Sequence, residues 1–394
     1  MPASPIRKLV PLANKAKAKG TVVYHLNIGQ PDLPTPEVAI EAARHLDRTV
    51  LEYSPSEGIR SFREKLVKYY HKFNIEVDVD DIIITTGGSE AVFFSFMACL
   101  DPGDEIIVPE PAYANYMAFA ISCGAVIKTV PSTIEEGFAL PSMEKFEELI
   151  SPRTKAILIC NPNNPTGYLY TQKEMDQIRD LVKKYDLFLF SDEVYREFCY
   201  TGAPYISAFH LKGIENNVVL VDSVSKRYSE CGLRIGALIT KNEQVRTNVM
   251  KWCQARLSPP LIGQIVAEAS LDTPDTYMLE VYNEYVEILK EELLPAMGCT
   301  EPIAVAYAAA VAVQALGEKP ESVEVNVSAN IIKNVKSVVV PCTGGLRGIG
   351  AAVCAGIVAG CPEKELEILE EITGEQKVEM KKMLDQYPSL KDFG

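Results

Sequence analysis

The sequence predicts an α/β fold, a three-layer sandwich whose mostly parallel sheet is covered by helices. Three observations predict it. The first two-thirds of the chain alternate short apolar runs with helix-like segments. The apolar runs lack polar alternation, which indicates strands buried on both faces, as in parallel sheets. The 394 residues also exceed the size at which one hydrophobic core usually stops growing, so we expect two domains.

The alternation can be followed element by element along the chain. The segments expected to hold strands are residues 81–88, 104–113, 155–167, 187–195 and 217–226. Each apolar run ends in glycine, proline or polar residues, which are typical of turns. Residues 89–100 are apolar on nearly all sides, as in a buried helix. Residues 171–186 predict an amphipathic helix that starts at a threonine.

The sequence changes character near residue 287. A helix-like stretch precedes this point, and an alanine-rich helix is expected at 303–316. A strand-like segment follows at 323–333, then a glycine-rich segment at 340–360 and a charged, helical tail. We therefore expect a small α+β fragment at the C-terminal end.

Composition excludes several classes of protein. The net charge is −14 and no long basic run is present, which argues against nucleic-acid binding. The ten cysteines form no C-x-x-C pair, so a reducing compartment without disulfides is expected. The first residues lack a signal-peptide core, and the longest apolar stretch is too short to span a bilayer. We expect a cytoplasmic protein with no membrane partner and no metal.

Polar residues follow the ends of the expected strands. In a parallel sheet these ends share one edge, where ligands bind. The residues are Ser89, Tyr113, Asn164, Asp192, Tyr195 and Lys226. Taken singly, each has a structural explanation: a helix cap, a turn, a packed aromatic ring or a surface lysine. The same holds for Ser223, Ser225 and Arg234 as solvated loop residues.

The combination predicts a more specific chemistry. A lysine amine traps carbonyl groups when its surroundings favour the neutral form. Pyridoxal phosphate offers such a carbonyl, and it requires a carboxylate at its ring nitrogen, an anion cradle for its phosphate and an aromatic face. The chain offers one candidate for each requirement, with GGSEA at 87–91 placing glycines and a hydroxyl at a helix start.

Seven ordered motifs resemble the class I/II aminotransferases, the fold-type I pyridoxal-phosphate enzymes. They are LNIGQPDLPTPE, YSPSEGIRSFRE, TTGGSEA, PEPAYANY, NPNNPTG, SDEVY and SVSKRYSECGLRIG, all before residue 287. The resemblance implies an N-terminal arm at 1–45 and a cofactor-binding large domain at 46–287. It implies a transferase that moves an amino group between an amino acid and a 2-oxo acid, and a homodimer.

The resemblance also implies residue roles. Lys226 would hold the cofactor as an internal aldimine and move a proton as acid and base. Asp192 would pair with the ring nitrogen, while Tyr195 and Asn164 would bond the ring oxygen. Tyr113 would stack on the ring.

The remaining implied roles concern the phosphate and the substrate. The phosphate would be held by Gly88, Ser89, Ser223, Ser225 and Arg234. Tyr53 is similar to the family tyrosine that reaches the phosphate of a neighbouring subunit. Gly29 is similar to the backbone that meets the substrate carboxylate, a group that Asn164 would also contact.

Residues 288–394 resemble the start of another family, the cysteine desulfidase and serine dehydratase alpha-like proteins. The motifs are GCTEPIAVAYAAAVA, VSANIIKNVKSV and VPCTGGLRGI. The usual aminotransferase small domain, with its arginine for the substrate carboxylate, is not found, because only Arg347 follows Arg256. Cys299 would be a family thiol without its partners.

Four functions remain open from the sequence. The first is an aminotransferase, and the second is a pyridoxal-phosphate lyase on the same fold. The third is a chimera that binds the cofactor but is catalytically impaired. The fourth is iron–sulfur chemistry of the C-terminal part, for which Cys299, Cys342, Cys354 and Cys361 suffice in number but not in spacing.

Overall fold

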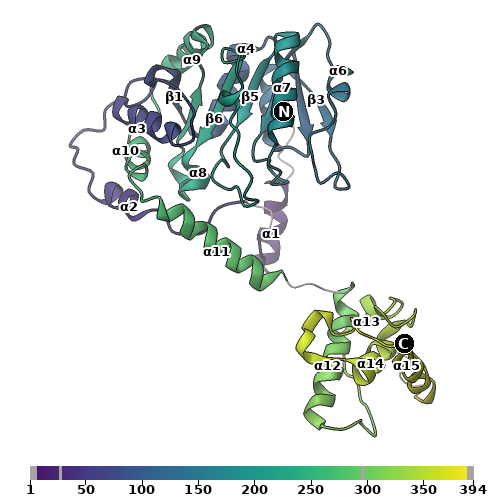
Figure 1. Cartoon of the computed structure of the whole chain (residues 1–394). Coiled ribbons are helices and arrows are strands. Elements are labelled where there is room, and N and C mark those ends of the chain that lie inside the picture. Colours follow the sequence, from purple (N-terminus) through teal and green to yellow (C-terminus); the bar gives the residue numbers. More distant parts are fainter. Residues whose placement is uncertain (1–6, 26–28, 294–297, 388–394) are drawn as a thin grey trace. The chain divides into compact units, whose positions relative to one another are not determined.

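The computed structural model describes residues 7–25, 29–293 and 298–387. The first three residues of the LNIGQPDLPTPE motif lie outside these ranges. The chain divides into two compact units, residues 1–283 and 284–394 (Figure 1). Each unit has its own hydrophobic core residues.

A seven-stranded sheet forms the centre of the first unit. Its spatial order is β1-β7-β6-β5-β4-β2-β3, and β7 alone runs antiparallel to its neighbours. The α/β fold with a mostly parallel sheet, predicted from the unalternating apolar runs, is confirmed. The strands are β1 (Ile82–Thr85), β2 (Glu105–Glu110), β3 (Val126–Pro131), β4 (Thr154–Cys160), β5 (Phe188–Asp192), β6 (Val218–Ser223) and β7 (Gly236–Ile239).

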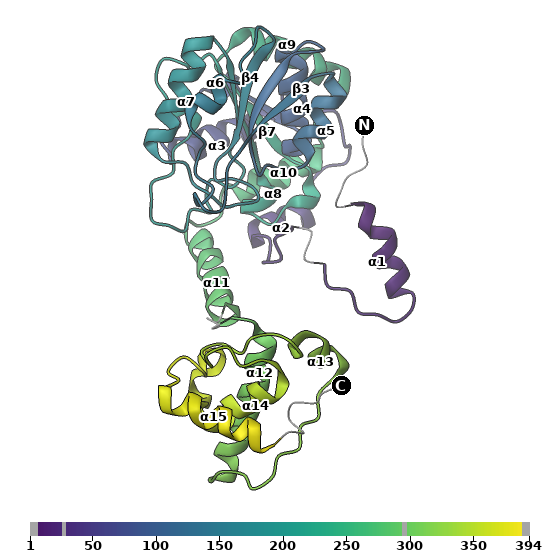
Figure 2. The same ribbon diagram turned by 90° about the vertical axis from the view of Figure 1, so that its right-hand side faces the viewer.

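Two layers of helices cover the sheet, and each encloses one apolar core. Figure 2 shows α3, α6 and α7 on one side of the sheet and α4 and α5 on the other. The core of the first face takes residues from α3 (Arg60–His71), α6 (Met143–Glu147), α7 (Gln172–Tyr185) and α10 (Leu261–Ser270). The core of the second face takes residues from α4 (Gly87–Cys99), α5 (Asn115–Cys123) and α9 (Glu243–Arg256).

Local sequence explains the two helices that were expected between strands. The side chain of Thr171 accepts a hydrogen bond from the Glu174 N–H and so caps α7, whose apolar residues face the core. Helix α4 is apolar nearly all round because it packs against the central strands β6 and β7.

Short elements connect the sheet to the rest of the first unit. Helices α1 (Val10–Lys17) and α2 (Glu37–Arg44) lie before the sheet in sequence. Helix α8 (Val224–Arg227) follows β6 directly, and the short 3-10 helix η4 (Cys231–Leu233) comes after it. Helix α11 (Thr276–Glu292) contains the boundary between the units, and no helix in the described ranges is long and apolar enough to cross a membrane.

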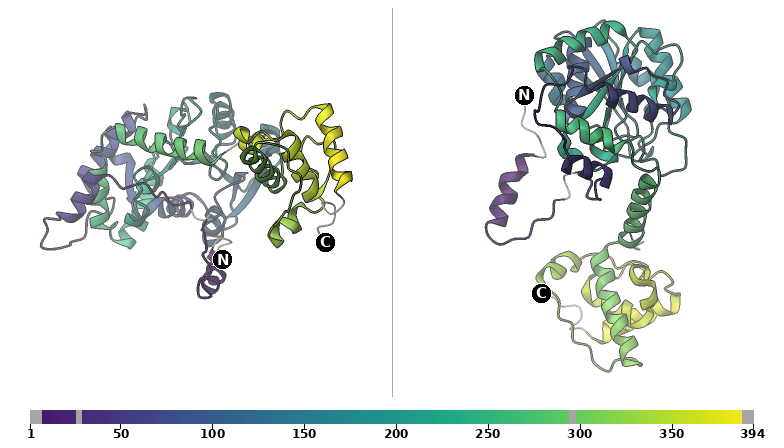
Figure 3. Two further views of the ribbon diagram at one scale, coloured as in Figure 1. Left: turned by 90° about the horizontal axis from the view of Figure 1, so that it is seen from below. Right: turned by 90° about the vertical axis from the view of Figure 1, so that its left-hand side faces the viewer.

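The second unit is built from helices in the part that the structure describes, drawn green to yellow in Figure 3. They are α12 (Thr300–Leu316), α13 (Ala329–Val335), α14 (Gly348–Ala359) and α15 (Gly374–Gln386). The alanine-rich helix expected at 303–316 is confirmed as part of α12. A Cβ at Gly356 would lie 2.1 Å from the carbonyl oxygen of Ala306, so the close contact of α12 and α14 requires glycine there.

The strand expected at 323–333, and with it the α+β description of this fragment, is wrong for the described residues. Residues 323–328 have no regular structure, and Ser328 instead caps α13 by accepting a hydrogen bond from the Ile331 N–H. An apolar alternation becomes a strand only where another strand pairs with it. Among the described residues of this unit, the only ladder is an isolated bridge between Val339 and Arg347.

One buried carboxylate ties three parallel strands together. Glu105 of β2 is 1% exposed and lies 2.9 Å from Lys128 of β3 and 3.1 Å from Arg153, which precedes β4. Burial by itself raises the pKa of Glu105, but hydrogen bonds from four neighbouring side chains outweigh burial and lower that pKa to about 2.

We expect Glu105→Gln to lower the free energy of unfolding by about 2–3 kcal/mol at neutral pH. Because the folded-state pKa is depressed, the contribution is present above pH 4.5 and is lost as pH falls toward 2. Urea denaturation of both proteins at pH 7 and at pH 3 measures it. A difference that stays constant over this range would contradict an ionic role.

Candidate active site

The expected site residues come together at the carboxyl ends of the central strands. Asp192 ends β5, Ser223 ends β6, and Asn164 follows β4 by four residues. The first turn of α4, at Gly87–Ser89, packs beside β6 and β7. Gly87 and Ser223, 136 residues apart in sequence, therefore meet at one edge of the sheet.

Asp192 is held by hydrogen bonds but has no cation beside it in the described parts of the chain. Its Oδ2 accepts a hydrogen bond of 2.6 Å from the Tyr116 hydroxyl, and its Oδ1 accepts one of 3.3 Å from the Val194 N–H. Burial raises the pKa of Asp192 to about 6, although both hydrogen bonds oppose the shift. The site thus contains a half-buried carboxyl group that a cationic partner would stabilise.

Tyr116 was not predicted from the sequence. It is 2% exposed, and its ring lies 5.4 Å from that of Tyr113 in an edge-to-face arrangement. Tyr113 and Tyr116 are three residues apart at the start of α5, so they share one side of that turn. This spacing in PAYANY is the signal that could have identified Tyr116, but only the fold shows that it faces Asp192.

Three other expected residues line the same edge. The Asn164 side-chain amide donates a hydrogen bond of 3.3 Å to the Tyr195 hydroxyl, so these two predicted partners of a ring oxygen lie together. Tyr113 accepts a hydrogen bond from Asn115 and is half-buried. Burial raises the pKa of both tyrosines, so their hydroxyl groups stay protonated at neutral pH.

Lys226 lies in α8, directly after the strand end at Ser223. Its Nζ donates a hydrogen bond to the carbonyl oxygen of Gly29. Lys226 and Gly29 are 197 residues apart, and the contact brings the expected substrate-side backbone to the expected reactive amine.

A group of donors and small residues lies beside α4. Gly87 has a φ of +75°, and a Cβ there would lie 2.5 Å from Nη2 of Arg234, so only glycine leaves room for the guanidinium. The hydroxyl groups of Ser223 and Ser225 are 2.7 Å apart, and the Ser223 hydroxyl also donates to the Ile235 carbonyl at 2.9 Å. The first N–H groups of α4 have no intrahelical acceptor, which favours an anion at this position.

Tyr53 is separate from this group within the chain. Its side chain is 75% exposed and, among the described residues, makes no polar contact. The expectation that it reaches a neighbouring subunit therefore stays a prediction.

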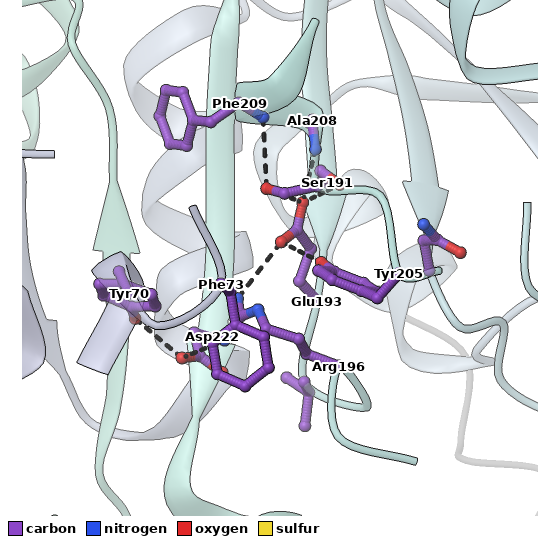
Figure 4. Close-up of polar contacts among 12 residues, drawn as sticks. Tyr70, Phe73, Ser191, Glu193, Arg196, Tyr205, Ala208, Phe209 and Asp222 are labelled. Atoms are coloured by element: carbon purple, nitrogen blue, oxygen red, sulfur yellow. Dashed lines mark hydrogen bonds and ion pairs between the residues drawn. The ribbon is translucent and has the colours of Figure 1, made fainter. Parts of the chain in front are cut away.

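A buried ionic network is formed by residues next to the site residues in sequence, and Figure 4 shows part of it. Asp222 accepts a hydrogen bond of 2.8 Å from Tyr70 and pairs with Arg196 at 3.3 Å and with Arg227. Burial by itself raises the pKa of Asp222, but the charges of Arg227 and Arg196 outweigh it and hold that pKa at about 2. Glu193 pairs with Arg196 at 3.2 Å.

Each charged member of this network adjoins a site residue in sequence. Glu193 follows Asp192, Arg196 follows Tyr195, Asp222 precedes Ser223 and Arg227 follows Lys226. For Asp222–Ser223 and Asp192–Glu193, at the ends of β6 and β5, side chains of successive residues point to opposite sides because the backbone is extended. The network was not predicted, because its members are distant in sequence and each charge alone is typical of a surface residue.

The residues present fit pyridoxal phosphate. Asp192 is a half-buried carboxyl group that forms no ion pair within the described ranges, and a protonated ring nitrogen requires such a partner. Gly87, Arg234 and the first turn of α4 form a cradle that a Cβ would fill, as a phosphate requires. Lys226 lies in α8, which follows directly from the end of β6 at Ser223.

The four C-terminal cysteines do not form a comparable site. Cys354 is buried in α14, Cys299 contacts Glu301, and Cys361 contacts Glu363. Among the described residues, no three His, Cys, Asp or Glu side chains are grouped to hold a metal ion. All ten cysteines of the chain are free thiols.

Comparison with known proteins shows which proteins this chain resembles. A family model described as aminotransferase class I and II matches residues 21–349. An aspartate aminotransferase of Thermotoga maritima is 34% identical over 296 residues, which cover 73% of this chain and 78% of that protein. An aspartate/prephenate aminotransferase of Thermus thermophilus is 32% identical and covers 71% of each chain.

Solved structures give the same result. The aspartate aminotransferase of Thermotoga maritima superposes with a TM-score of 0.68 at 33% identity and covers 74% of this chain and 78% of that one. That of Thermus thermophilus with maleate has a TM-score of 0.66 at 30% identity, covering 80% and 79%. The family match continues through residues 288–349, although the motifs in this range resemble the cysteine desulfidase and serine dehydratase alpha-like proteins.

We expect Asp192→Asn to stabilise the cofactor-free protein by about 2 kcal/mol at pH 7.5. The folded-state pKa of Asp192 is raised, so the wild-type stability is fully present below pH 3.8 and declines as pH rises through 6. Thermal unfolding at pH 4 and at pH 7.5 checks this, with the two proteins similar at pH 4. Lower stability of the variant at pH 7.5 would show that the surrounding protein already stabilises the ionised carboxylate of Asp192.

Proposed function

The chain belongs to the class I and II aminotransferases, and we propose that Lys226, Asp192 and Arg234 are the centre of its pyridoxal-phosphate site. The enzyme is a pyridoxal-phosphate-dependent transferase that moves an amino group between an amino acid and a 2-oxo acid. The single observation that carries the site proposal is the half-buried carboxyl group of Asp192, which has no cation in an ion pair with it among the described residues.

The proposed roles follow from the contacts of each residue. When bound, the cofactor supplies an aldehyde that a lysine amine can bond and a ring that withdraws electrons from the substrate Cα. Asp192 would accept the hydrogen bond of the ring N–H and keep that proton in place. The Tyr116 hydroxyl, 2.6 Å from Asp192, would fix the orientation of the carboxylate.

Lys226 would carry the proton that leaves and returns to the substrate. Its Nζ contacts the carbonyl oxygen of Gly29, so its reach extends to the backbone that we assign to the substrate carboxylate. Asn164 and Tyr195, joined by their own hydrogen bond, would orient the ring oxygen, and Asn164 would also meet the substrate. Tyr113 would cover the ring face.

The phosphate would be bound at the opposite end of the site. Arg234 supplies a guanidinium directly beside Gly87, and charge-assisted hydrogen bonds to phosphate are the strong ones. Gly88 and Ser89 would contribute N–H groups, and Ser223 and Ser225 their hydroxyl groups. We also propose that Tyr53 contributes to the phosphate site of a second subunit, because its exposed ring needs a partner and oligomers of this kind are closed dimers.

Aspartate is the first substrate to test. Relatives from Thermotoga maritima and Pyrococcus horikoshii are named aspartate aminotransferases, and that of Thermus thermophilus is named for aspartate and prephenate. We propose that substrate binding is weak, because Arg347, the last arginine of the chain, donates to the Ser337 carbonyl within the second unit. This observation favours an impaired chimera as the second candidate function; a lyase remains an alternative that turnover without a 2-oxo acid would reveal.

The domain organisation is also a proposal. We retain an arm at 1–45, a large domain at 46–287 and a fragment at 288–394 that resembles the start of the cysteine desulfidase family. The boundary between the compact units, at residues 283 and 284, supports a change of domain near this point. We further propose a cytoplasmic location, which the sequence supports, and a homodimer, which the family resemblance supports.

Lys226→Ala is expected to abolish the absorption band of lysine-bound cofactor and to reduce transamination of aspartate by about 10²–10⁴-fold or more. Borohydride should fix the cofactor to the wild-type chain and not to the variant. Lys251→Ala, an exposed lysine of α9, is the matched control and should retain band and activity. Retention of the band in Lys226→Ala would refute the site.

Arg234→Ala is expected to raise the dissociation constant for pyridoxal phosphate about 10- to 100-fold. This factor corresponds to the free energy that charge-assisted hydrogen bonds contribute. Binding of pyridoxal, which lacks the phosphate, should change little. Spectroscopic titration of both compounds into wild type and variant measures the effect. An equal loss for both compounds would indicate a general structural role of Arg234.

A further inference from the structure

A short segment joins the proposed reactive lysine to the proposed phosphate clamp. It runs from Tyr228 to Leu233 and holds both Lys226 and Arg234 in place. Ser229 and Arg234 have φ values of +54° and +56°, in the left-handed region that non-glycine residues rarely adopt. Such backbone persists only when the surroundings hold it, so this segment requires an anchor.

The anchor is the carboxyl group of Glu230. The residue is 3% exposed, and its Oε1 contacts the hydroxyl of Ser270 at the end of α10. Its Oε2 is buried and has no hydrogen-bond partner among the described residues. On the other side of the segment, Thr35 donates a hydrogen bond of 3.2 Å to the Ser229 carbonyl.

Counting hydrogens at Ser270 assigns the proton. The Ser270 Oγ lies 3.0 Å from the Val266 carbonyl oxygen and also contacts Oε1 of Glu230. A hydroxyl has one hydrogen, and a carbonyl oxygen can only accept. A single hydroxyl hydrogen shared between two acceptors gives two weakened bonds, whereas a protonated Glu230 that donates to Ser270 leaves Ser270 free to donate fully to Val266, so the two contacts favour a neutral Glu230.

The surroundings of Glu230 favour the same protonation state. Burial raises the pKa of Glu230 to about 8, and the hydrogen bond with Ser270 and the charge of Arg227 oppose this shift only in part. Tyr228, the other titratable neighbour, has a raised pKa through burial and stays neutral. An ionised Glu230 would keep one unpartnered buried oxygen, which is costly for a charge.

We propose that Glu230, in its neutral form, is a positioning residue that fixes the segment between Lys226 and Arg234 and thereby keeps the cofactor site assembled. The proposal rests on the cofactor placement given above and adds a proton-dependent support to it. Glu230 acts through Lys226 and Arg234 and does not touch the reacting atoms.

A pH dependence of cofactor binding follows. When only the neutral form is competent, the competent fraction falls about tenfold between pH 7 and pH 9 for a group that titrates near pH 8. The apparent dissociation constant rises by the same factor. Glu230→Gln removes the titration, while its amide can still donate a hydrogen bond to Ser270.

The test is a spectroscopic titration of pyridoxal phosphate into the full-length, cofactor-free chain at pH 7, 8 and 9. Wild type should lose about tenfold more affinity than Glu230→Gln over this range. Glu243→Gln, an exposed glutamate of α9, is the matched control and should follow wild type. Parallel curves for wild type and Glu230→Gln would overturn the proposal, because the intrinsic pH dependence of the cofactor is common to both.

A second readout does not depend on a variant that folds. Infrared spectra of wild type should show a protonated-carboxyl band at pH 7, above the titration of Asp192, that disappears with the same midpoint as the affinity. Absence of the band, or its persistence while affinity falls, would overturn the assignment. Absence of cofactor binding at every pH would instead refute the proposed function, and with it this inference.

Discussion

The buried ion pairs of Asp222 with Arg196 and Arg227 are the constraint on which the rest of the site depends. Removing one partner of a buried pair leaves an uncompensated charge and costs about 3–5 kcal/mol, so these residues have little freedom to move. Each of these charged residues is joined to a site residue by one peptide bond. Holding the charged residue in place therefore also restricts the neighbouring site residue. The network thus restricts the backbone positions of four site residues, namely Asp192, Tyr195, Ser223 and Lys226.

The two aspartates at neighbouring strand ends show how environment separates their roles. Asp222 is surrounded by guanidinium groups and remains ionised, whereas Asp192 has a hydroxyl and an N–H but no cation in the described chain. The first is satisfied by the protein itself, and the second is left to be satisfied by a ligand. A site of this kind is less stable empty than occupied, so binding and folding are coupled.

The same reasoning applies at the phosphate end. The segment after Lys226 contains two non-glycine residues in the left-handed region and a buried carboxyl group with a free oxygen. Its geometry is maintained by contacts from α10 and from Thr35 near the start of the chain. The clamp and the reactive amine are therefore supported by distant parts of the first unit.

The sequence by itself determined the α/β class, the position of five strands and the group of residues that meet at their ends. Apolar runs, turn residues and helix caps are local features, and the topology of a parallel sheet then places strand ends at one edge. Only the tertiary structure decided that Tyr116 faces Asp192, that four charged residues form a buried network, and that Glu230 is buried against Ser270. These depend on which distant segments exclude water from a group, and no local pattern encodes that. The wrongly predicted strand at 323–333 has the same origin, because alternation becomes a strand only beside a partner strand.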